Sequence, residues 1–193
     1  MMCATYQLSF DDIAEIKKIS DEITNKYGED AASRTFGTDF YPKSEAPVIG
    51  KKNQIVMLKW GFPLKDTSKI IFNARAESLT EKPLYKGILS NRCLVPAIAF
   101  YEWSGDKTKY RISINRAKLF YMAALWKVEV LSDNTKAYYY TIITTEPNKQ
   151  IKEIHSRMPA IITPENSSVW LRDGKNAFTL LRPFEAEMTL TAV

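Results

Sequence analysis

Three side chains of kinds used in covalent and acid–base catalysis are far apart in the sequence: the thiol of Cys3, the carboxyl of Glu102 and the imidazole of His155. A cysteine with a histidine beside it in space is the arrangement of cysteine hydrolases, in which the base activates the thiol. Sequence spacing does not show that proximity. A cysteine near a chain end is also compatible with no role, and a single histidine is more often structural than catalytic.

The same residue types argue against a zinc site. The chain has two cysteines, Cys3 and Cys93, and one histidine. These side chains fall short of the four ligands of an ordinary structural zinc site. We therefore expect no metal and no cofactor.

Glu102 lies among aromatic residues in the segment AFYEW at 99–103. Its carboxyl is either turned to water or placed in a partly apolar pocket. A pocket would raise its pKa, so that the group could exchange protons near neutral pH. The sequence leaves both environments open.

Polar residues alternate in the segment IIFNARAES at 70–78: Asn73, Arg75 and Glu77. On a strand this alternation places the three side chains on one face. That face is either an ordinary solvated surface or a binding site. The small residues Ala74 and Ala76 between them indicate close packing behind the polar row.

Two tryptophans invite different interpretations. Trp60 precedes Gly61 at the end of a predicted strand, so it is either core or a platform on which a nucleobase stacks. Trp126 lies inside a longer apolar run and is predicted to be core.

These residues need elements to position them, and the first element predicted is a helix over 9–28. Isoleucines recur at helical spacing, Ser9 and Asp12 form a capping-box pattern, and Gly28 is a stop signal. The breakers Gly37, Pro42 and Pro47 predict an extended loop from Ala32 to Pro47.

Strands dominate the rest of the chain. Runs rich in β-branched and aromatic residues predict strands at 54–62, 69–76, 92–103, 109–114, 119–130, 137–145 and 159–163. The segment SGDK at 104–107 has turn chemistry. Thr145 and Pro147 predict the start of a helix over 146–155, and 167–174 predicts a helical turn ended by Gly174. The sum predicts one mixed α+β domain, mostly antiparallel and partly barrel-like sheet with peripheral helices.

Composition sets the class of protein. The chain has 193 residues, 45% of them hydrophobic, with net charge +5 and pI about 9.1. A chain of this size and apolar content can fill a core, and its mild basicity is compatible with a polyanion without requiring one. No signal peptide or membrane-spanning run is recognised, so we expect a cytoplasmic, reduced protein without a Cys3–Cys93 disulfide.

Six fragments together resemble the SOS response-associated peptidase (SRAP) family, whose members process abasic sites in DNA. They are MC at 2–3, APVI at 46–49, LKWGF at 58–62, FNARAES at 72–78, RCLVPAIAFYEW at 92–103 and IHSRMPAII at 154–162. They follow the order of the family and span almost the whole chain. The resemblance implies a single SRAP-like domain over residues 1–193.

The resemblance implies a specific reaction. In the family the cysteine becomes the first residue and reacts with the ring-opened aldehyde of an abasic site in single-stranded DNA. An α-amino group with a pKa near 8 is partly unprotonated at neutral pH and can form a Schiff base. The neighbouring thiol then closes a five-membered thiazolidine, which gives a reason for a thiol at the start of the chain.

Roles carry over from the family residue by residue. Cys3 is the nucleophile, and Asn73 positions its amine or the sugar oxygen. Arg75 grips a phosphate. Glu102 is the general acid and base that opens the sugar ring, and His155 assists Schiff-base chemistry.

The resemblance also implies contacts with neighbouring nucleotides, from Trp60 and from Arg157, Met158 and Pro159. It further implies a monomer that acts in the cytoplasm, on the nucleoid when bound to damaged DNA, without a membrane.

The sequence departs from the family pattern in three places. The family start MCGR reads MCAT here, with Ala4 and Thr5, and Ala99 stands where glycine is common. Met1 and Met2 both precede Cys3, and methionine aminopeptidase prefers a small second residue. Either Met2 is the true start, or the Cys3 amine stays acylated and cannot form the ring.

Three functions follow as alternatives. The first is crosslinking to abasic single-stranded DNA, which shields the lesion from strand breakage. The second is a peptidase limited to removing its own leading residues. The third is a non-catalytic single-strand binder, whose affinity would fall steeply with salt and would not depend on Cys3.

Overall fold

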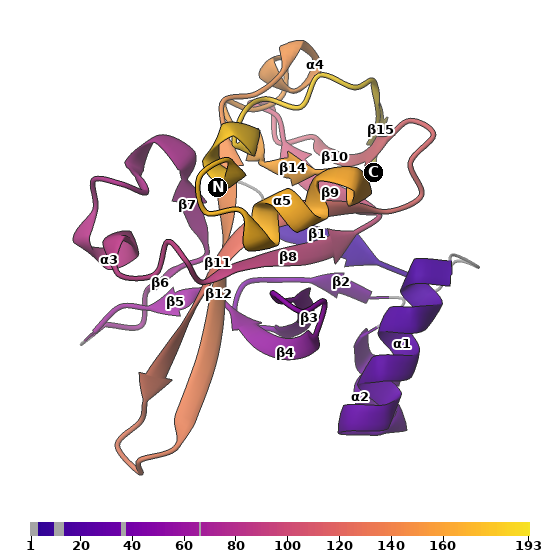
Figure 1. Ribbon diagram of the computed structural model, residues 1–193. Coiled ribbons are helices and arrows are strands. Elements are labelled where there is room, and N and C mark those ends of the chain that lie inside the picture. Colours follow the sequence, from indigo (N-terminus) through magenta and orange to yellow (C-terminus); the bar gives the residue numbers. More distant parts are fainter. Residues whose placement is uncertain (1–3, 10–13, 36–37, 66) are drawn as a thin grey trace.

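The computed structural model describes residues 4–9, 14–35, 38–65 and 67–193, and its strands form two main sheets (Figure 1). The first sheet is antiparallel throughout. Its order is β15 (Met188–Ala192), β10 (Lys109–Ile114), β9 (Ala99–Trp103), β1 (Thr5–Leu8) and β2 (Thr38–Phe40).

The second sheet closes into a barrel. Its order is β13 (Met158–Pro159), β12 (Lys136–Thr145), β4 (Ile55–Trp60), β3 (Glu45–Ile49), β8 (Arg92–Ala97), β11 (Phe120–Val130) and β14 (Ile161–Ile162). A further pairing of β11 with β12 closes the ring β12–β4–β3–β8–β11. β7 (Asn73–Arg75) pairs in parallel with β12 outside this ring. The prediction of a mostly antiparallel, partly barrel-like α+β domain is confirmed.

Short helices lie around the sheets: α1 (Ala14–Tyr27), α2 (Glu29–Thr35), α3 (Pro83–Lys86), α4 (Lys149–Lys152), α5 (Ser167–Arg172), and the 3₁₀ turns η1 (Ala76–Ser78), η2 (Pro164–Asn166) and η3 (Ala177–Leu180). The predicted stop of α1 is confirmed, because Gly28 has φ +88° and its N–H donates to Thr24 O at 2.9 Å. Asp12 of the predicted capping box lies outside the described residues. The cap of α4 is Asn148, whose side chain accepts from Ile151 N, rather than the predicted start at Pro147.

The loop predicted from Ala32 to Pro47 is wrong. This segment contains the end of α2, the strand β2 and half of β3. Both strands are held by partners distant in sequence, β2 by β1 and β3 by β4, so local breakers did not decide the outcome. Pro47 is tolerated because β3 and β8 pair only through Ile49 and Leu94 in the described ladder, which leaves Pro47 without a strand on its second side.

Four predicted strands are each divided in two, those over 54–62, 69–76, 92–103 and 159–163. The strand predicted over 92–103 divides at Ile98 into β8 of the barrel and β9 of the first sheet, so one run of residues joins the two sheets. The strand predicted over 54–62 divides at Gly61 into β4 and β5 (Phe62–Pro63), which pairs with β6 (Ile70–Ile71). Gly61 has φ +112°, and a Cβ there would lie 2.6 Å from Ile70 Cδ1, so glycine is required.

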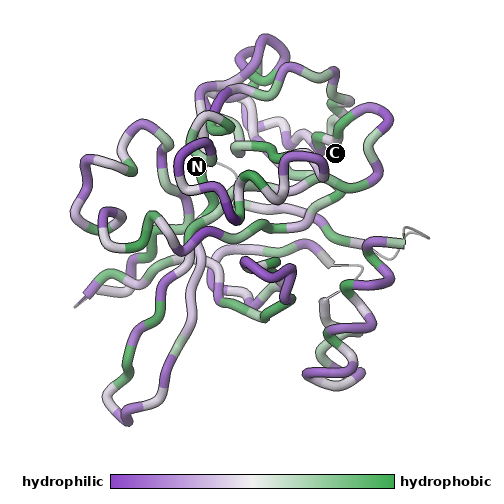
Figure 2. The backbone as a smooth tube through the Cα atoms, viewed as in Figure 1, coloured by the Kyte–Doolittle hydropathy of each residue, from purple (hydrophilic) through white to green (hydrophobic). Residues whose placement is uncertain are grey.

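Large apolar side chains fill the space within and between the sheets. Trp60, Trp170, Tyr6, Tyr140 and Phe100 are fully buried, and hydrophobic residues run along most of the barrel strands (Figure 2). β11 and β12 continue beyond the rest of the barrel as a projecting hairpin (Figure 1).

Candidate functional site on β7, β9 and β12

Asn73 and Arg75 of the predicted polar row lie on β7, which pairs with the end of β12 in the barrel. β7 runs in parallel beside β12, with Asn73 opposite Ile142 and Arg75 opposite Thr144. Ala74 is buried against the core, Asn73 is half-buried and Arg75 is exposed. The alternation therefore places Asn73 and Arg75 together on the side away from the core.

Glu77 does not continue this row, which corrects the prediction. The strand ends at Arg75, and Glu77 lies in the 3₁₀ turn η1. There its Oε2 accepts from Arg157 Nη2 at 2.8 Å. Burial alone would raise the pKa of Glu77, but the hydrogen bond from Arg157 and the charges of Arg157 and Arg75 together lower it below its usual value.

Arg157 joins the two strands that flank the end of β12. Its Nη2 also donates to Thr144 O at 2.7 Å, and Thr144 lies opposite Arg75 on one side and Pro159 on the other. Arg157 is 8% exposed and Met158 is fully buried. In this structure Arg157 therefore holds β7 and β13 in place, and the implied nucleotide contacts of Arg157, Met158 and Pro159 stay a prediction.

His155 lies two residues before Arg157, just after α4. Its N–H donates to Ile151 O at 2.8 Å, and its Nδ1 accepts from Arg157 N at 3.2 Å. Burial lowers the pKa of His155 below its usual value, partly opposed by the hydrogen bond with the Arg157 backbone. The lowered pKa favours the neutral ring at pH 7, and Nδ1, which lies 3.2 Å from Arg157 N and 3.4 Å from Arg157 O, is occupied by the Arg157 backbone.

The lowered pKa predicts a pH-dependent stability. Between the lowered pKa and the unfolded value of about 6.5, the unfolded chain binds more protons than the folded one, so stability rises with pH across this window. We expect the free energy of unfolding of the wild type to fall as the pH drops below about 6.5, and to fall less for His155→Gln. Urea unfolding at a series of pH values measures this difference. Equal pH profiles for the two proteins would contradict it.

The sequence left open whether the Glu102 carboxyl is turned to water or lies in a pocket, and the structure buries it. It is 0% exposed on β9, opposite Tyr110 of β10. Its neighbours Tyr101 and Trp103 face the other side of the sheet, where Lys109 Nζ lies 4.1 Å and 5.6 Å from their ring centroids. Strand alternation therefore points the Glu102 carboxyl toward the interior of the protein.

The first strand, β1, lies next to the strand that carries Glu102. β1 runs antiparallel to β9 with Thr5 opposite Tyr101. In this register the residue before Thr5, Ala4, approaches the level of Glu102. Cys3 itself lies outside the described residues.

A buried pair of tyrosines ties the Glu102 sheet to the Asn73 side of the barrel. The hydroxyl groups of Tyr6, on β1, and Tyr140, on β12, lie 2.8 Å apart. Tyr6 lies opposite Phe100, which is two residues before Glu102 on β9. Tyr140 is two residues before Ile142, the residue that lies opposite Asn73. Sequence reasoning missed this pair, and it missed the link between Glu77 and Arg157, because partners so distant in sequence leave no local pattern.

Trp60 belongs to this buried cluster, which is the core position of the two that the sequence left open, and its implied role beside neighbouring nucleotides stays a prediction. It is 0% exposed. Its ring stacks on Tyr140 at 6.2 Å between centroids, and its Nε1 donates to Phe72 O at 2.8 Å. Trp60 therefore supports the segment before Asn73 from inside.

Neither a metal centre nor a membrane span is found in the described part of the chain. No group of three or more His, Cys, Asp or Glu side chains gathers there closely enough to hold an ion. No helix of those residues is long and apolar enough to cross a membrane.

Comparisons with known proteins find relatives of this chain. Abasic site processing protein YoqW of Bacillus subtilis (strain 168) is 40% identical over 152 residues, which cover 72% of this chain and 68% of that protein. Abasic site processing protein HMCES of Xenopus tropicalis is 30% identical over 191 residues, which cover 75% of this chain and 57% of that protein.

Solved structures show the same fold. A crystal structure of a Bacteroides thetaiotaomicron protein matches with a TM-score of 0.85 at 24% identity, covering 99% of this chain and 92% of that one. A family model described as SOS response associated peptidase (SRAP) matches residues 2–193. With its motifs on β7 and β9 and after α4, the chain belongs to the SRAP family.

Proposed function

We propose that this protein processes abasic sites in single-stranded DNA by forming a covalent thiazolidine through Cys3. The observation that supports the proposal is the register of β1 on β9, which brings Ala4, the residue after Cys3, to the level of the buried Glu102. Relatives at 40% and 30% identity are named abasic site processing proteins.

The reaction balances with the loss of one water molecule. The Cys3 amine adds to the aldehyde carbon of the ring-opened sugar, and loss of water forms the imine. The Cys3 sulfur then adds to the same carbon, and the thiol proton ends on the ring nitrogen. Because both nucleophiles belong to one residue, the second step is intramolecular and gains the rate advantage of enforced proximity.

The neighbouring side chains have roles that fit their environments. Glu102, shielded from water, donates a proton to the ring oxygen as the sugar opens and takes one up as the imine forms. His155, neutral at pH 7, assists proton transfer at the sugar hydroxyl. The half-buried Asn73 positions the amine or the sugar oxygen.

DNA is held from the exposed side of β7. Arg75 is exposed, and its positive charge helps to lower the pKa of Glu77. A guanidinium so placed can bind a phosphate next to the lesion. An abasic nucleotide has no base to unstack, so it enters a pocket at low cost, which favours damaged over intact strands.

The chemistry requires a free Cys3 amine, and Met1 and Met2 precede that residue in the sequence. Removal of both by the protein itself would be a peptidase activity of the kind in the family name, with Cys3, Glu102 and His155 as its groups. Intact mass of wild type and Glu102→Gln expressed from the same gene tests this second candidate. Self-processing predicts that only the variant keeps the leading methionines.

A crosslinking assay with defined termini tests the main proposal. One preparation starts at Cys3, released from a precursor cut directly before it, and a control keeps Met2. We expect only the first to form a heat-stable adduct with an abasic oligonucleotide, with a mass equal to protein plus DNA minus one water. Neither should react with an intact strand or with a tetrahydrofuran analogue that cannot open. No adduct from the protein that starts at Cys3 would refute the proposal.

A further inference from the structure

The end of the barrel that faces away from Arg75 is open. A cavity of about 380 Å³ there is lined by residues from all the strands of the ring, among them Val48, Leu58, Cys93, Trp126 and Tyr138. We call this cavity the barrel mouth. Its volume lies within the range of sites that take a ligand or a large side chain.

The register shows that the barrel mouth is lined by the inner face of the barrel. Val48 lies opposite Val56, and Trp60 lies opposite Tyr140, which lies opposite Trp126. Directly opposed residues share a face of a sheet, and alternate residues on one strand do so too. The mouth is thus a continuation of the buried stack of Trp60 and Tyr140, at the point where core packing stops.

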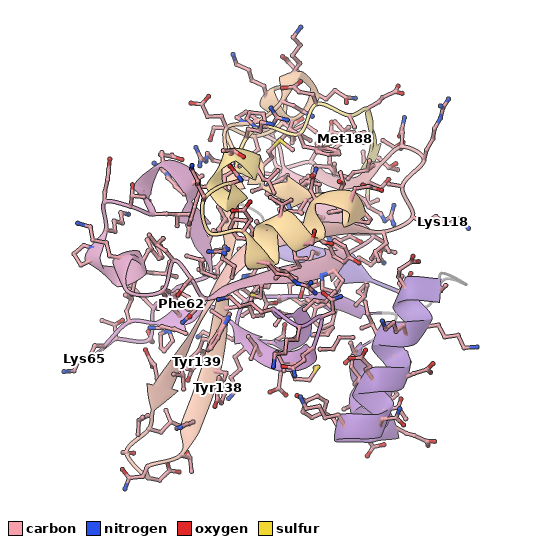
Figure 3. The ribbon with its side chains drawn as sticks, in the orientation of Figure 1. Phe62, Lys65, Lys118, Tyr138, Tyr139 and Met188 are labelled. Atoms are coloured by element: carbon pink, nitrogen blue, oxygen red, sulfur yellow. The ribbon has the colours of Figure 1, made fainter. Side chains whose placement is uncertain are left out.

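The apolar surface does not end at the mouth. Along the projecting hairpin, Val128 lies opposite Tyr138 and Val130 opposite Lys136, on the same face as Trp126. Val128, Val130 and Tyr138 are 44%, 65% and 43% exposed, and Tyr138 can be followed at the base of the hairpin in Figure 3. An apolar strip this long, continuous with a cavity, calls for an occupant longer than a small molecule.

The edge of β4 beside the mouth can accept an added strand. The described ladder between β4 and β12 covers only Lys59 with Tyr139 and Trp60 with Tyr140. Farther along this edge, Ile55 O accepts from Lys26 Nζ and Met57 N donates to Tyr27 Oη, each at a long 3.4 Å. A peptide strand could replace these two weak side-chain contacts with main-chain hydrogen bonds.

The charged side chains around the barrel mouth are lysines, which favour an occupant with acidic groups. Of the described residues that line the cavity, Lys51 carries a charge and the others are uncharged. Lys26 reaches the edge of β4, and Lys136 lies on the apolar face of the hairpin. Acidic groups on the occupant would meet these lysines, which adds specificity and speeds encounter.

We propose that the barrel mouth and the apolar face of the β11–β12 hairpin form a docking site for an extended, acidic peptide segment of a partner protein. One large apolar side chain of the segment fills the mouth, and its main chain lies along β4. The site is distinct from the abasic-site chemistry, because Tyr138 and Thr144 are six residues apart on β12, about 20 Å of extended strand.

Selection from a phage-displayed library of random dodecapeptides tests this proposal. On the wild-type protein we expect enrichment of peptides with one aromatic or branched apolar residue and neighbouring aspartate or glutamate. For the best synthetic peptide, Lys51→Glu and Val130→Lys should each weaken binding by about tenfold in fluorescence anisotropy, a loss of about 1.4 kcal/mol. Lys52→Glu, next to Lys51 but outside the cavity lining, should change it by less than about twofold.

Amide exchange locates the bound peptide. The Met57 amide and the β11–β12 hairpin should gain protection when the peptide binds, and adduct formation with abasic DNA should not change in Lys51→Glu or Val130→Lys. No enriched sequence, enrichment without acidic residues, or protection elsewhere would each overturn the proposal. So would self-association in analytical ultracentrifugation that Val130→Lys abolishes, because the occupant would then be a second copy of the chain.

Discussion

Alanine in place of Cys3 is expected to abolish the heat-stable adduct with abasic DNA, lowering its yield by more than about a hundredfold. The variant still has an α-amino group when its leading methionines are removed, so it can still form an imine. Without the thiol the imine cannot close to a thiazolidine and hydrolyses back. We therefore expect borohydride to trap an adduct with Cys3→Ala that heat alone destroys.

The second cysteine provides the matched control. Cys93 is 1% exposed on β8, and burial raises the pKa of its thiol far above the usual value, so it stays protonated and unreactive. Cys93→Ala should form the heat-stable adduct at the wild-type level. A heat-stable adduct with Cys3→Ala, or its loss with Cys93→Ala at unchanged melting temperature, would contradict the role of Cys3.

Glutamine in place of Glu102 is expected to slow adduct formation by about 10²–10⁴-fold, the usual contribution of a general acid or base. This corresponds to about 3–5 kcal/mol in the activation barrier. The amide keeps the shape of the side chain in its buried position on β9 but cannot donate or accept the proton that ring opening needs. Single-turnover rates on an abasic oligonucleotide measure the loss.

Two controls separate proton transfer from binding and folding. Affinity for a strand with the tetrahydrofuran analogue should stay within a few-fold of wild type, because that lesion binds without opening. Glu129→Gln, which removes a carboxylate paired with Lys127 on the hairpin, should leave the rate unchanged within about twofold. If Glu102→Gln lost affinity for the analogue in proportion to its rate, Glu102 would be a binding residue and the proposed proton transfer would be wrong.

Much of the secondary structure was predictable because it depends on neighbours in the chain. Isoleucines at helical spacing and Gly28 predicted α1 and its end. Apolar and β-branched runs predicted β10, β11 and β12 nearly to the residue. The motifs around Asn73 and Glu102 likewise identified the family without coordinates. In each case the determining residues are close in sequence, and a local pattern carries the information.

Tertiary structure alone decided how these elements meet. The division of one apolar run at Ile98, which puts Glu102 in a different sheet from β8, depends on where β1 and β11 dock. The burial of Trp60 and the pairing of Arg157 with Glu77 depend on partners that folding brings together from distant parts of the chain. A residue type and its spacing determine what chemistry a side chain can perform. Whether it faces DNA or the core is determined by long-range packing, because burial is a property of the assembled sheets and not of any one strand.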